Sequence, residues 1–127
     1  MNFKQIYHIA IIGSDYAESL HFYRDVLGFE VIREHQRPDK DDVKIDLKIN
    51  ETTELELFIK PDAPRRVNYP EAQGLRHLAF ATRQIETDIA ELKSQGVEVE
   101  ALRTDYYTGE KIVFFYDPDG LPIELHE

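Results

Sequence analysis

The chain repeats one sequence pattern, and this repeat constrains its fold more than any other feature. Three short segments of the first half return in the same order in the second half, at a nearly constant offset. The matching pairs are residues 6–11 with 75–80, 28–31 with 96–99, and 55–57 with 123–125. The repeat therefore predicts two related modules that follow one another along the chain.

The segment that joins the two modules is also visible. Residues 61–74 contain three of the six prolines and have no helical or strand periodicity, which predicts a loop. The modules are then residues 1–60 and 75–127. Because a module of this size alone would bury little surface, we expect a single domain over residues 1–127 that contains both.

Each module has the pattern of one helix among four strands. The first module predicts a strand at 4–12, a helix at 15–27, and strands at 29–36, 43–50 and 54–60. The second predicts a strand at 75–82, a helix at 85–95, and strands at 97–103, 111–116 and 121–126. Residues 104–110 are expected to form a loop. The order βαβββ, found twice, indicates the α+β class.

Four side chains that can bind metals lie at matching points of the repeat. Because successive side chains of a strand point to opposite faces, each of these strands has one apolar face and one face with a polar residue. The polar residues are His8, Glu56, His77 and Glu124. Histidine and glutamate are unfavourable in the middle of apolar strands, so another interaction must compensate for them. Pairing of the two modules would gather all four.

Two imidazoles and two carboxylates suit one divalent metal ion, and their two negative charges balance it. The sequence therefore predicts a single metal site. The other histidines give weaker signals. His21 and His35 are expected at the surface, and His126 is expected either to fray at the C-terminus or to act near Glu124.

Composition excludes several classes of function. The chain has no cysteine, which excludes disulfides and thiolate ligands. Its formal charge of −10 argues against nucleic acid and anionic membrane as partners. No apolar run approaches the roughly 18 residues of a membrane span, and residues 1–4 lack the pattern of a secretory signal. We expect a cytoplasmic protein with a small-molecule substrate.

Two segments carry a resemblance to a known family. Residues 19–29, which read SLHFYRDVLGF, and residues 115–125, which read FYDPDGLPIEL, resemble the glyoxalase I branch of the vicinal oxygen chelate superfamily. The resemblance extends over essentially the whole chain. It implies two paired βαβββ modules that form a cupped mixed sheet around a metal ion, and it places the family's ligands on His8, Glu56, His77 and Glu124.

The function implied by the resemblance is that of a metal-dependent lyase. Such an enzyme isomerises the hemithioacetal of a 2-oxoaldehyde and a thiol to a 2-hydroxyacyl thioester by proton transfer through an enediolate. We expect Glu124 to be the base, with Glu56 as its near-symmetric counterpart. The resemblance favours Zn or Ni, while Co, Mn and Fe also suit the ligands. It further implies a homodimer, with modules paired within one chain or between two.

Other activities of the same superfamily remain open. A metal-dependent dioxygenase, a thiol transferase that acts on an antibiotic, and a small-molecule-binding or antibiotic-resistance module are the alternatives. The sequence also departs from the glutathione-using members. These have an arginine four residues after the first ligand histidine and an asparagine four residues after the first ligand glutamate, where this chain has Ile12 and Lys60. The glutathione clamp of these members is therefore not reproduced.

A few residues are candidates for substrate contact. Lys60, Arg65 and Arg66 form a local basic patch that either grips an anionic substrate or is solvated linker charge. Tyr106, Tyr107 and Lys111 are candidates to line the mouth of the cup.

Overall fold

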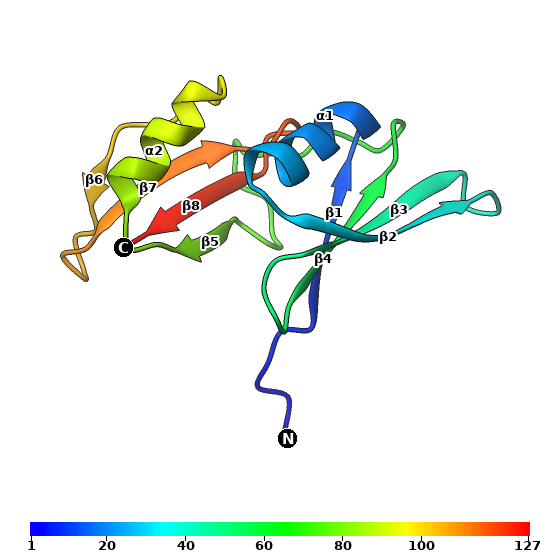
Figure 1. Cartoon of the computed structure of the whole chain (residues 1–127), viewed down its shortest axis with the longest axis horizontal. Coiled ribbons are helices and arrows are strands. Elements are labelled where there is room, and N and C mark those ends of the chain that lie inside the picture. Colours follow the sequence, from blue (N-terminus) through cyan, green and yellow to red (C-terminus); the bar gives the residue numbers. More distant parts are fainter. The chain divides into compact units, whose positions relative to one another are not determined.

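The computed structural model describes residues 1–127 and divides into two compact units, Met1–Pro64 and Arg65–Glu127. Each unit contains one four-stranded sheet, and each is described by itself (Figure 1). The predicted joining segment is divided between the units, because residues 61–64 belong to the first and residues 65–74 to the second. A single domain made of both modules stays a prediction.

Unit 1 has the element order of the predicted first module. Its elements are β1 (His8–Gly13), α1 (Tyr16–Leu20), η1 (His21–Val26), β2 (Glu30–Arg37), β3 (Asp42–Lys48) and β4 (Glu54–Ile59). The strands lie in the order β1-β4-β3-β2. β1 and β4 are parallel and the other neighbours are antiparallel, so the sheet is mixed.

Unit 2 repeats this arrangement. Its elements are β5 (Leu78–Ala81), α2 (Ile85–Ser94), β6 (Arg103–Thr104), β7 (Lys111–Tyr116) and β8 (Pro122–His126). The order β5-β8-β7-β6, with β5 and β8 parallel, corresponds strand for strand to the sheet of unit 1. The two mixed sheets confirm the α+β class and the βαβββ module expected twice from the sequence.

The predicted helix at 15–27 forms, but its second half is wider than an α-helix. Asp15 caps it, since its carboxylate accepts a hydrogen bond of 2.9 Å from the backbone N–H of Glu18. From His21 the backbone continues as a π-helix, and the N–H of Leu27 bonds to the carbonyl of Phe22, five residues back. Gly28, with φ of 77°, then ends the helix.

Alternation along the strands separates a core face from a polar face in each sheet. In unit 1, Ile11, Ile45 and Leu57 are buried, and the register places both Ile11 and Ile45 beside Leu57. In unit 2, Phe115 and Ile123 are buried register partners. The face opposite to these residues is the one on which the sequence places the candidate ligands.

Three predicted strands are shorter in the structure, and one of them, expected at 75–82, is β5 at Leu78–Ala81. The strand expected at 97–103 is reduced to a single bridge between Val99 and Phe115 and to the two-residue β6. It lies at a sheet edge and has only β7 as a neighbour, so it pairs only where it follows β7 closely. The first strand begins at His8 rather than at residue 4, because β4, its only neighbour, extends no further.

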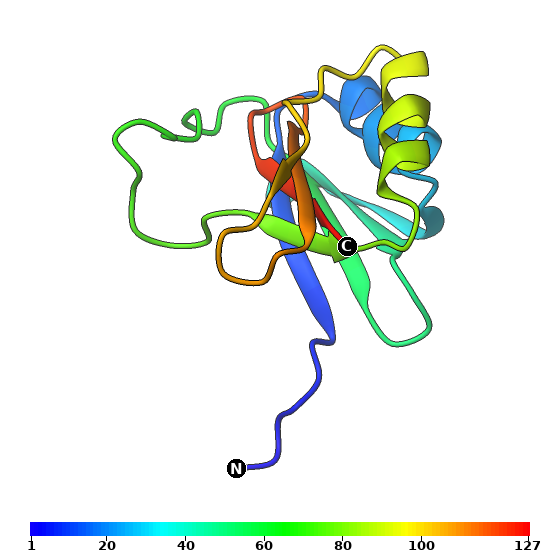
Figure 2. The same ribbon diagram turned by 90° about the vertical axis from the view of Figure 1, so that its left-hand side faces the viewer.

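In unit 2, the helix and the preceding loop lie on opposite sides of the sheet. Figure 2 shows α2 on one side of β5, β7 and β8, and the loop of residues 65–74 on the other.

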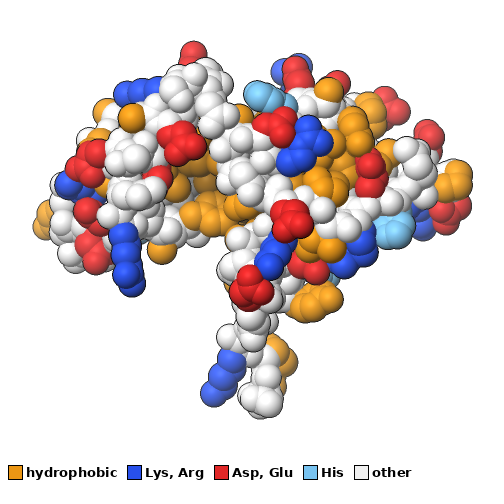
Figure 3. Space-filling view, in the orientation of Figure 1, with side chains coloured by type: hydrophobic (Ala, Val, Ile, Leu, Met, Phe, Trp, Pro, Cys, Tyr) orange, Lys and Arg blue, Asp and Glu red, His pale blue; other side chains and the backbone are white.

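No helix of the structure combines the length and apolar character needed to cross a membrane. On the face drawn in Figure 3, acidic and basic side chains are interspersed rather than gathered by sign.

Candidate functional site

The first candidate pair of ligands lies on two parallel strands of unit 1. β1 carries His8 and β4 carries Glu56, and the register places Ala10 beside Glu56, so the two polar side chains are diagonal neighbours on one face. His8 Nε2 is 2.8 Å from Glu56 Oε1. The Glu56 side chain is 14% exposed and that of His8 is 41% exposed, so the pair is partly open to solvent.

A lysine from β3 binds the other oxygen of Glu56. Lys44 Nζ lies 2.5 Å from Glu56 Oε2 and 3.2 Å from Oδ1 of the buried Asp46. The hydrogen bond to Glu56 is the main cause of a raised pKa of Lys44, so this amine stays charged near neutral pH. Both carboxylate oxygens of Glu56 are therefore held.

The second candidate pair repeats this geometry in unit 2. His77 lies directly before β5, Glu124 lies on β8, and His77 Nε2 is 3.0 Å from Glu124 Oε2. Arg76 Nη1 is 3.1 Å from the other ring nitrogen of His77. Because a guanidinium only donates, Nδ1 accepts and Nε2 carries the proton that faces Glu124. Coordination of a metal ion by a neutral imidazole through Nε2 requires that proton to move to Nδ1, which would end the hydrogen bond from Arg76.

The two pairs differ in what the neighbouring strand places beside the glutamate. In unit 1 the register partner of Glu56 on β3 is Asp46, which also binds Lys44. In unit 2 the register partner of Glu124 on β7 is Phe114. The Phe114 ring contacts the His77 ring edge-on, with centroids 5.1 Å apart. Glu124 thus has an apolar neighbour where Glu56 has a charged network.

Each unit by itself offers one nitrogen and one oxygen donor on one face of its sheet. This donor set fits a divalent cation of the Zn or Ni type, because imidazole and carboxylate are ligands for both. No group of three or more His, Asp or Glu side chains is gathered for a metal ion in the structure. The single site with all four ligands therefore stays a prediction.

The candidate substrate contacts are in part engaged within their own units. In unit 1, Lys60 Nζ lies 3.2 Å from Asp42 Oδ2, and Arg37 binds the same carboxylate with two bonds of 2.6 Å. The pKa of Asp42 is lowered to about 2, mainly by the hydrogen bonds from Arg37 and to a smaller extent by Lys60. In unit 2, Lys111 is ion-paired with Glu86.

The two tyrosines of the loop after β6 are almost fully exposed. Tyr106 and Tyr107 contact one another edge-on, with ring centroids 5.3 Å apart. Arg65 is exposed, whereas Arg66 donates to the carbonyls of Leu75 and Arg76. A role in substrate binding stays a prediction for each of these residues.

The remaining histidines lie outside the two pairs. His21 and His35 are exposed, as the sequence indicates. His126 is not frayed, because it lies in β8 with Ala81 and Ile112 as register partners. Its ring is 3.3 Å from Glu110 and 3.7 Å from Asp105. Its pKa is raised, chiefly by a bond to the Glu127 carbonyl.

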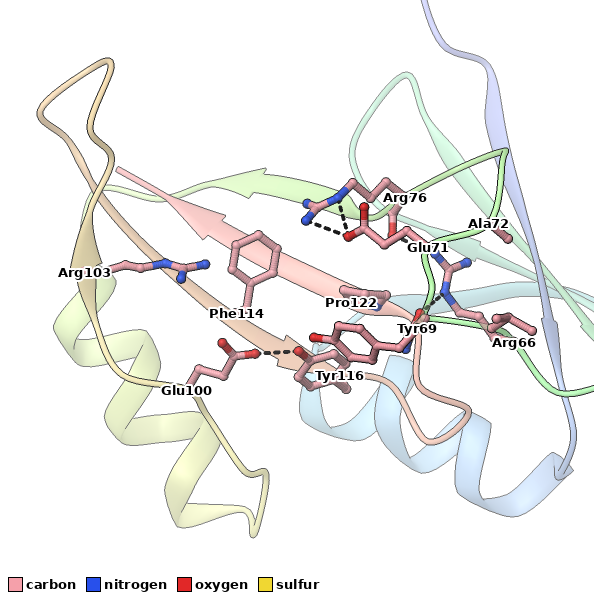
Figure 4. Close-up of a pocket in the computed structure, with 12 residues that line it drawn as sticks. Arg66, Tyr69, Glu71, Ala72, Arg76, Glu100, Arg103, Phe114, Tyr116 and Pro122 are labelled. Atoms are coloured by element: carbon pink, nitrogen blue, oxygen red, sulfur yellow. Dashed lines mark hydrogen bonds and ion pairs between the residues drawn. The ribbon is translucent and has the colours of Figure 1, made fainter.

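Unit 2 also contains a cavity of about 270 Å³ that the sequence did not indicate. It lies between the loop of residues 65–74 and the strands β6, β7 and β8, and Figure 4 shows its side chains. Arg76, Arg103 and Phe114 are among them. The repeat could have pointed to Phe114, which occupies the position equivalent to Asp46, but nothing in the sequence links the arginines to it.

The chain is similar to known proteins over its full length. The model of the Glyoxalase/Bleomycin resistance protein/Dioxygenase superfamily matches residues 5–125. The uncharacterized protein YwkD of Bacillus subtilis is 49% identical, covering 100% of this chain and 99% of YwkD. A crystal structure of a glyoxalase family protein from Enterococcus faecalis is 56% identical, with a TM-score of 0.96 and full coverage of both chains.

A glyoxalase I from Leishmania major shares the fold at a lower level of similarity. It is 23% identical, with a TM-score of 0.76, and the alignment covers 98% of this chain and 86% of that one. This likeness concerns the fold alone. The family model and relatives of high identity match the chain, which also has the repeated βαβββ modules. The chain therefore belongs to the Glyoxalase/Bleomycin resistance protein/Dioxygenase superfamily.

Proposed function

We propose that the chain is a metal-dependent lyase of the glyoxalase I type, which isomerises a hemithioacetal to a 2-hydroxyacyl thioester. The observation that carries the proposal is the duplicated pair of ligands. His8 with Glu56 and His77 with Glu124 have the same residue types, nearly the same separation of 2.8 and 3.0 Å, and equivalent places in the repeat. A module whose only task was to enclose a ligand would not need two such pairs.

One divalent ion, Zn or Ni in our proposal, would be held by His8, Glu56, His77 and Glu124. When bound, it supplies Lewis-acid stabilisation of the negative charge that develops on two adjacent substrate oxygens. The two glutamates balance the charge of the ion, and the two imidazoles bind as neutral ligands.

The proton transfer is assigned to Glu124. Its carboxylate takes the proton from C1 of the hemithioacetal and returns a proton to C2, while the proton of the C1 hydroxyl ends on the C2 oxygen, so that C1 becomes the thioester carbonyl and C2 the alcohol. The surroundings support this choice over Glu56. Lys44 holds Glu56 by a second ion pair, whereas Glu124 is ion-paired only with His77 and has the Phe114 ring on the neighbouring strand.

The thiol of the hemithioacetal is proposed to be one other than glutathione. The two positions that would clamp glutathione carry Ile12 and Lys60. Ile12 has no hydrogen-bonding side chain, and Lys60 is already paired with Asp42. Turnover of methylglyoxal adducts of several thiols, followed by the ultraviolet absorbance of the thioester, tests this. Faster turnover with glutathione than with any other thiol would contradict it.

Elemental analysis of the metal-loaded protein tests the metal site directly. We expect one ion per chain in the unmodified protein and loss of the ion in His77→Ala and Glu124→Ala. His21→Ala, which removes an exposed imidazole outside both pairs, is the matched control and should keep its ion. Full metal content in both site variants, with folding intact, would refute the assignment.

Comparison of Glu124→Gln with Glu56→Gln tests the assignment of the base. At equal metal content, loss of a general base should lower kcat by about 10²–10⁴-fold. We expect this loss in Glu124→Gln and a smaller one in Glu56→Gln. Equal losses, or a larger loss in Glu56→Gln, would reverse the assignment.

The protein is also proposed to be a homodimer. If modules pair between chains, mixing His8→Ala with His77→Ala protein restores intact sites in the mixed dimer, because one site then receives both unaltered modules. If modules pair within a chain, mixing restores nothing. Light scattering of the unmodified protein gives the mass, and a monomer would rule out the dimer.

A further inference from the structure

The cavity of unit 2 contains a cationic group that the proposed function does not use. Its floor is the polar face of β7 and β8, and its rim is the loop of residues 65–74 (Figure 4). Three arginines and two glutamates line it, so the charge of the lining is positive by one. The lining side chains with charge are Arg66, Arg76, Arg103, Glu71 and Glu100.

Two of the three arginines are occupied by the protein itself. Arg76 is bound to Glu71, with Nε and Nη2 each 2.9 Å from Oε1. Arg66 donates 2.8 Å to the Asn68 side chain and 2.7–2.8 Å to the carbonyls of Leu75 and Arg76. These contacts hold the loop that forms the rim, so both arginines have a structural task.

The third arginine is free to bind a ligand. The Arg103 guanidinium makes no ion pair and no hydrogen bond, and its Cζ lies over the Phe114 ring, 5.3 Å from the centroid. This contact orients the guanidinium without using its N–H donors. Figure 4 shows the Arg103 side chain extending from β6 toward Phe114, in the open part of the cavity.

Glu100, the lining carboxylate that does not bind Arg76, is engaged by another partner. Glu100 Oε2 accepts a hydrogen bond of 2.5 Å from the Tyr116 hydroxyl. This bond, with burial as a smaller cause, raises the pKa of Tyr116 to about 12, so the hydroxyl remains a donor at neutral pH. Glu100 is thereby fixed on Tyr116 and leaves Arg103 unpaired.

We propose that this cavity binds the carboxylate of a small organic monoanion through the Arg103 guanidinium, with the aromatic rings of Phe114 and Tyr69, which both line the cavity, against its apolar part. A planar guanidinium matches a carboxylate with two parallel hydrogen bonds. The single positive charge of the lining favours a monoanion over a dianion. A volume of about 270 Å³ suits a molecule of the size of an aryl or short alkyl acid.

The position of the cavity connects such a ligand to the candidate ligands of unit 2. Phe114 forms the floor of the cavity, contacts the His77 ring and is the register partner of Glu124. A carboxylate on Arg103 therefore lies one aromatic ring away from His77. The next step rests on the proposed function. If the chain is the proposed lyase, the carboxylate bound by Arg103 is part of the substrate, so the reacting thiol adduct carries a carboxylate.

Binding is tested on the metal-free full-length protein with 3-phenylpropionate as the probe and its neutral amide, 3-phenylpropanamide, as the matched ligand. We expect backbone amide resonances of residues around Arg103 and Phe114 to shift in two-dimensional NMR spectra with the acid and much less with the amide. Equal shifts with the amide, or shifts confined to other parts of the chain, would overturn the proposal.

Variants separate the guanidinium from general charge. Loss of a charge-assisted bond should weaken binding of the acid about tenfold or more in Arg103→Gln. Arg103→Lys keeps the charge but loses the planar fork, and we expect a loss of severalfold. Arg83→Gln removes an exposed arginine of the same unit outside the cavity and should change the affinity less than twofold. Equal effects of Arg103→Gln and Arg83→Gln would overturn the proposal.

Turnover distinguishes failure of this proposal from failure of the proposed function. The substrates are the methylglyoxal adducts of 3-mercaptopropionate and of its methyl ester. We expect a higher kcat/KM for the acid, and loss of that preference in Arg103→Gln. Turnover without preference refutes the role of the cavity and leaves the lyase intact. Arg103-dependent binding of 3-phenylpropionate without any turnover refutes the lyase and leaves the cavity intact.

Discussion

Replacement of Lys44 by methionine is the most informative perturbation of unit 1, because this lysine joins a candidate ligand to a buried acid. Lys44 is 25% exposed and binds both Glu56 and Asp46. Methionine keeps most of the apolar stem and removes the charge. The variant therefore tests whether the ion pairs, rather than packing, hold the polar face of this sheet.

The cost is set mainly by Asp46. Its side chain is 3% exposed, and its Oδ1 has no hydrogen-bond partner, with Lys44 Nζ at 3.2 Å as its neighbouring cation. Removing one partner of a fully buried ion pair costs about 3–5 kcal/mol. Because Arg33 Nε still holds Oδ2 at 2.9 Å, we expect a smaller loss, about 2–3 kcal/mol of unfolding free energy.

Urea unfolding followed by circular dichroism measures this change. A loss of that size should lower the midpoint by about 1–2 M, given urea slopes of about 1–3 kcal/mol per M. Lys48→Met is the matched control on the same strand, since Lys48 pairs only with the exposed Glu51. We expect it to leave the midpoint nearly unchanged.

A second variant separates the ion pairs from other effects of the substitution. In Lys44→Met combined with Asp46→Leu, no buried carboxylate is left without its cation, so most of the lost stability should return. The reasoning is refuted if Lys44→Met unfolds at the same urea concentration as Lys48→Met. It is also refuted if the double variant is less stable than Lys44→Met.

Three further predictions concern the scaffold. Arg37 holds the pKa of Asp42 at about 2, against its usual 3.8. The stability from this pair is therefore complete above pH 3.8 and is lost as the pH falls toward 2. In Asp42→Asn, the free energy of unfolding should depend less on pH in that range. Leu57→Ala, at a fully buried position, should cost about 2–5 kcal/mol in urea unfolding. Gly96→Ala, at φ of 80°, should lower thermal stability by about 1–2 kcal/mol.

Strand alternation and the repeat were sufficient to predict which faces the candidate ligands occupy. His8 and Glu56 are distant in sequence, yet the period of two and the repeat placed them on one face, where the structure finds them 2.8 Å apart. The start of the helix expected at 15–27 was also predictable, because Asp15, which the structure shows to cap it, is a local signal.

Features that depend on the surroundings of a segment in the folded chain could not be predicted from the sequence. The strand expected at 97–103 has suitable residues, but its edge position limits it to Val99 and the short β6. The π-helical turn from His21 has an ordinary helical pattern in its sequence. The cavity was not predicted for the same reason, since Arg76 and Arg103 lie on separate segments and meet only through the fold of unit 2.

The departures from the repeat indicate how two similar half-sites can differ in chemistry. A strict duplication would give Glu56 and Glu124 the same neighbours and the same role. Instead, the neighbouring strand places Asp46 beside Glu56 and Phe114 beside Glu124, at equivalent register positions. Lys44 holds Glu56 by a second ion pair, whereas Glu124 has His77 as its ion-pair partner and Phe114, which also lines the cavity of unit 2, on the neighbouring strand. In the proposed mechanism, this one difference between the repeats separates a held ligand, Glu56, from the proposed base, Glu124, and places the proposed carboxylate site beside that base.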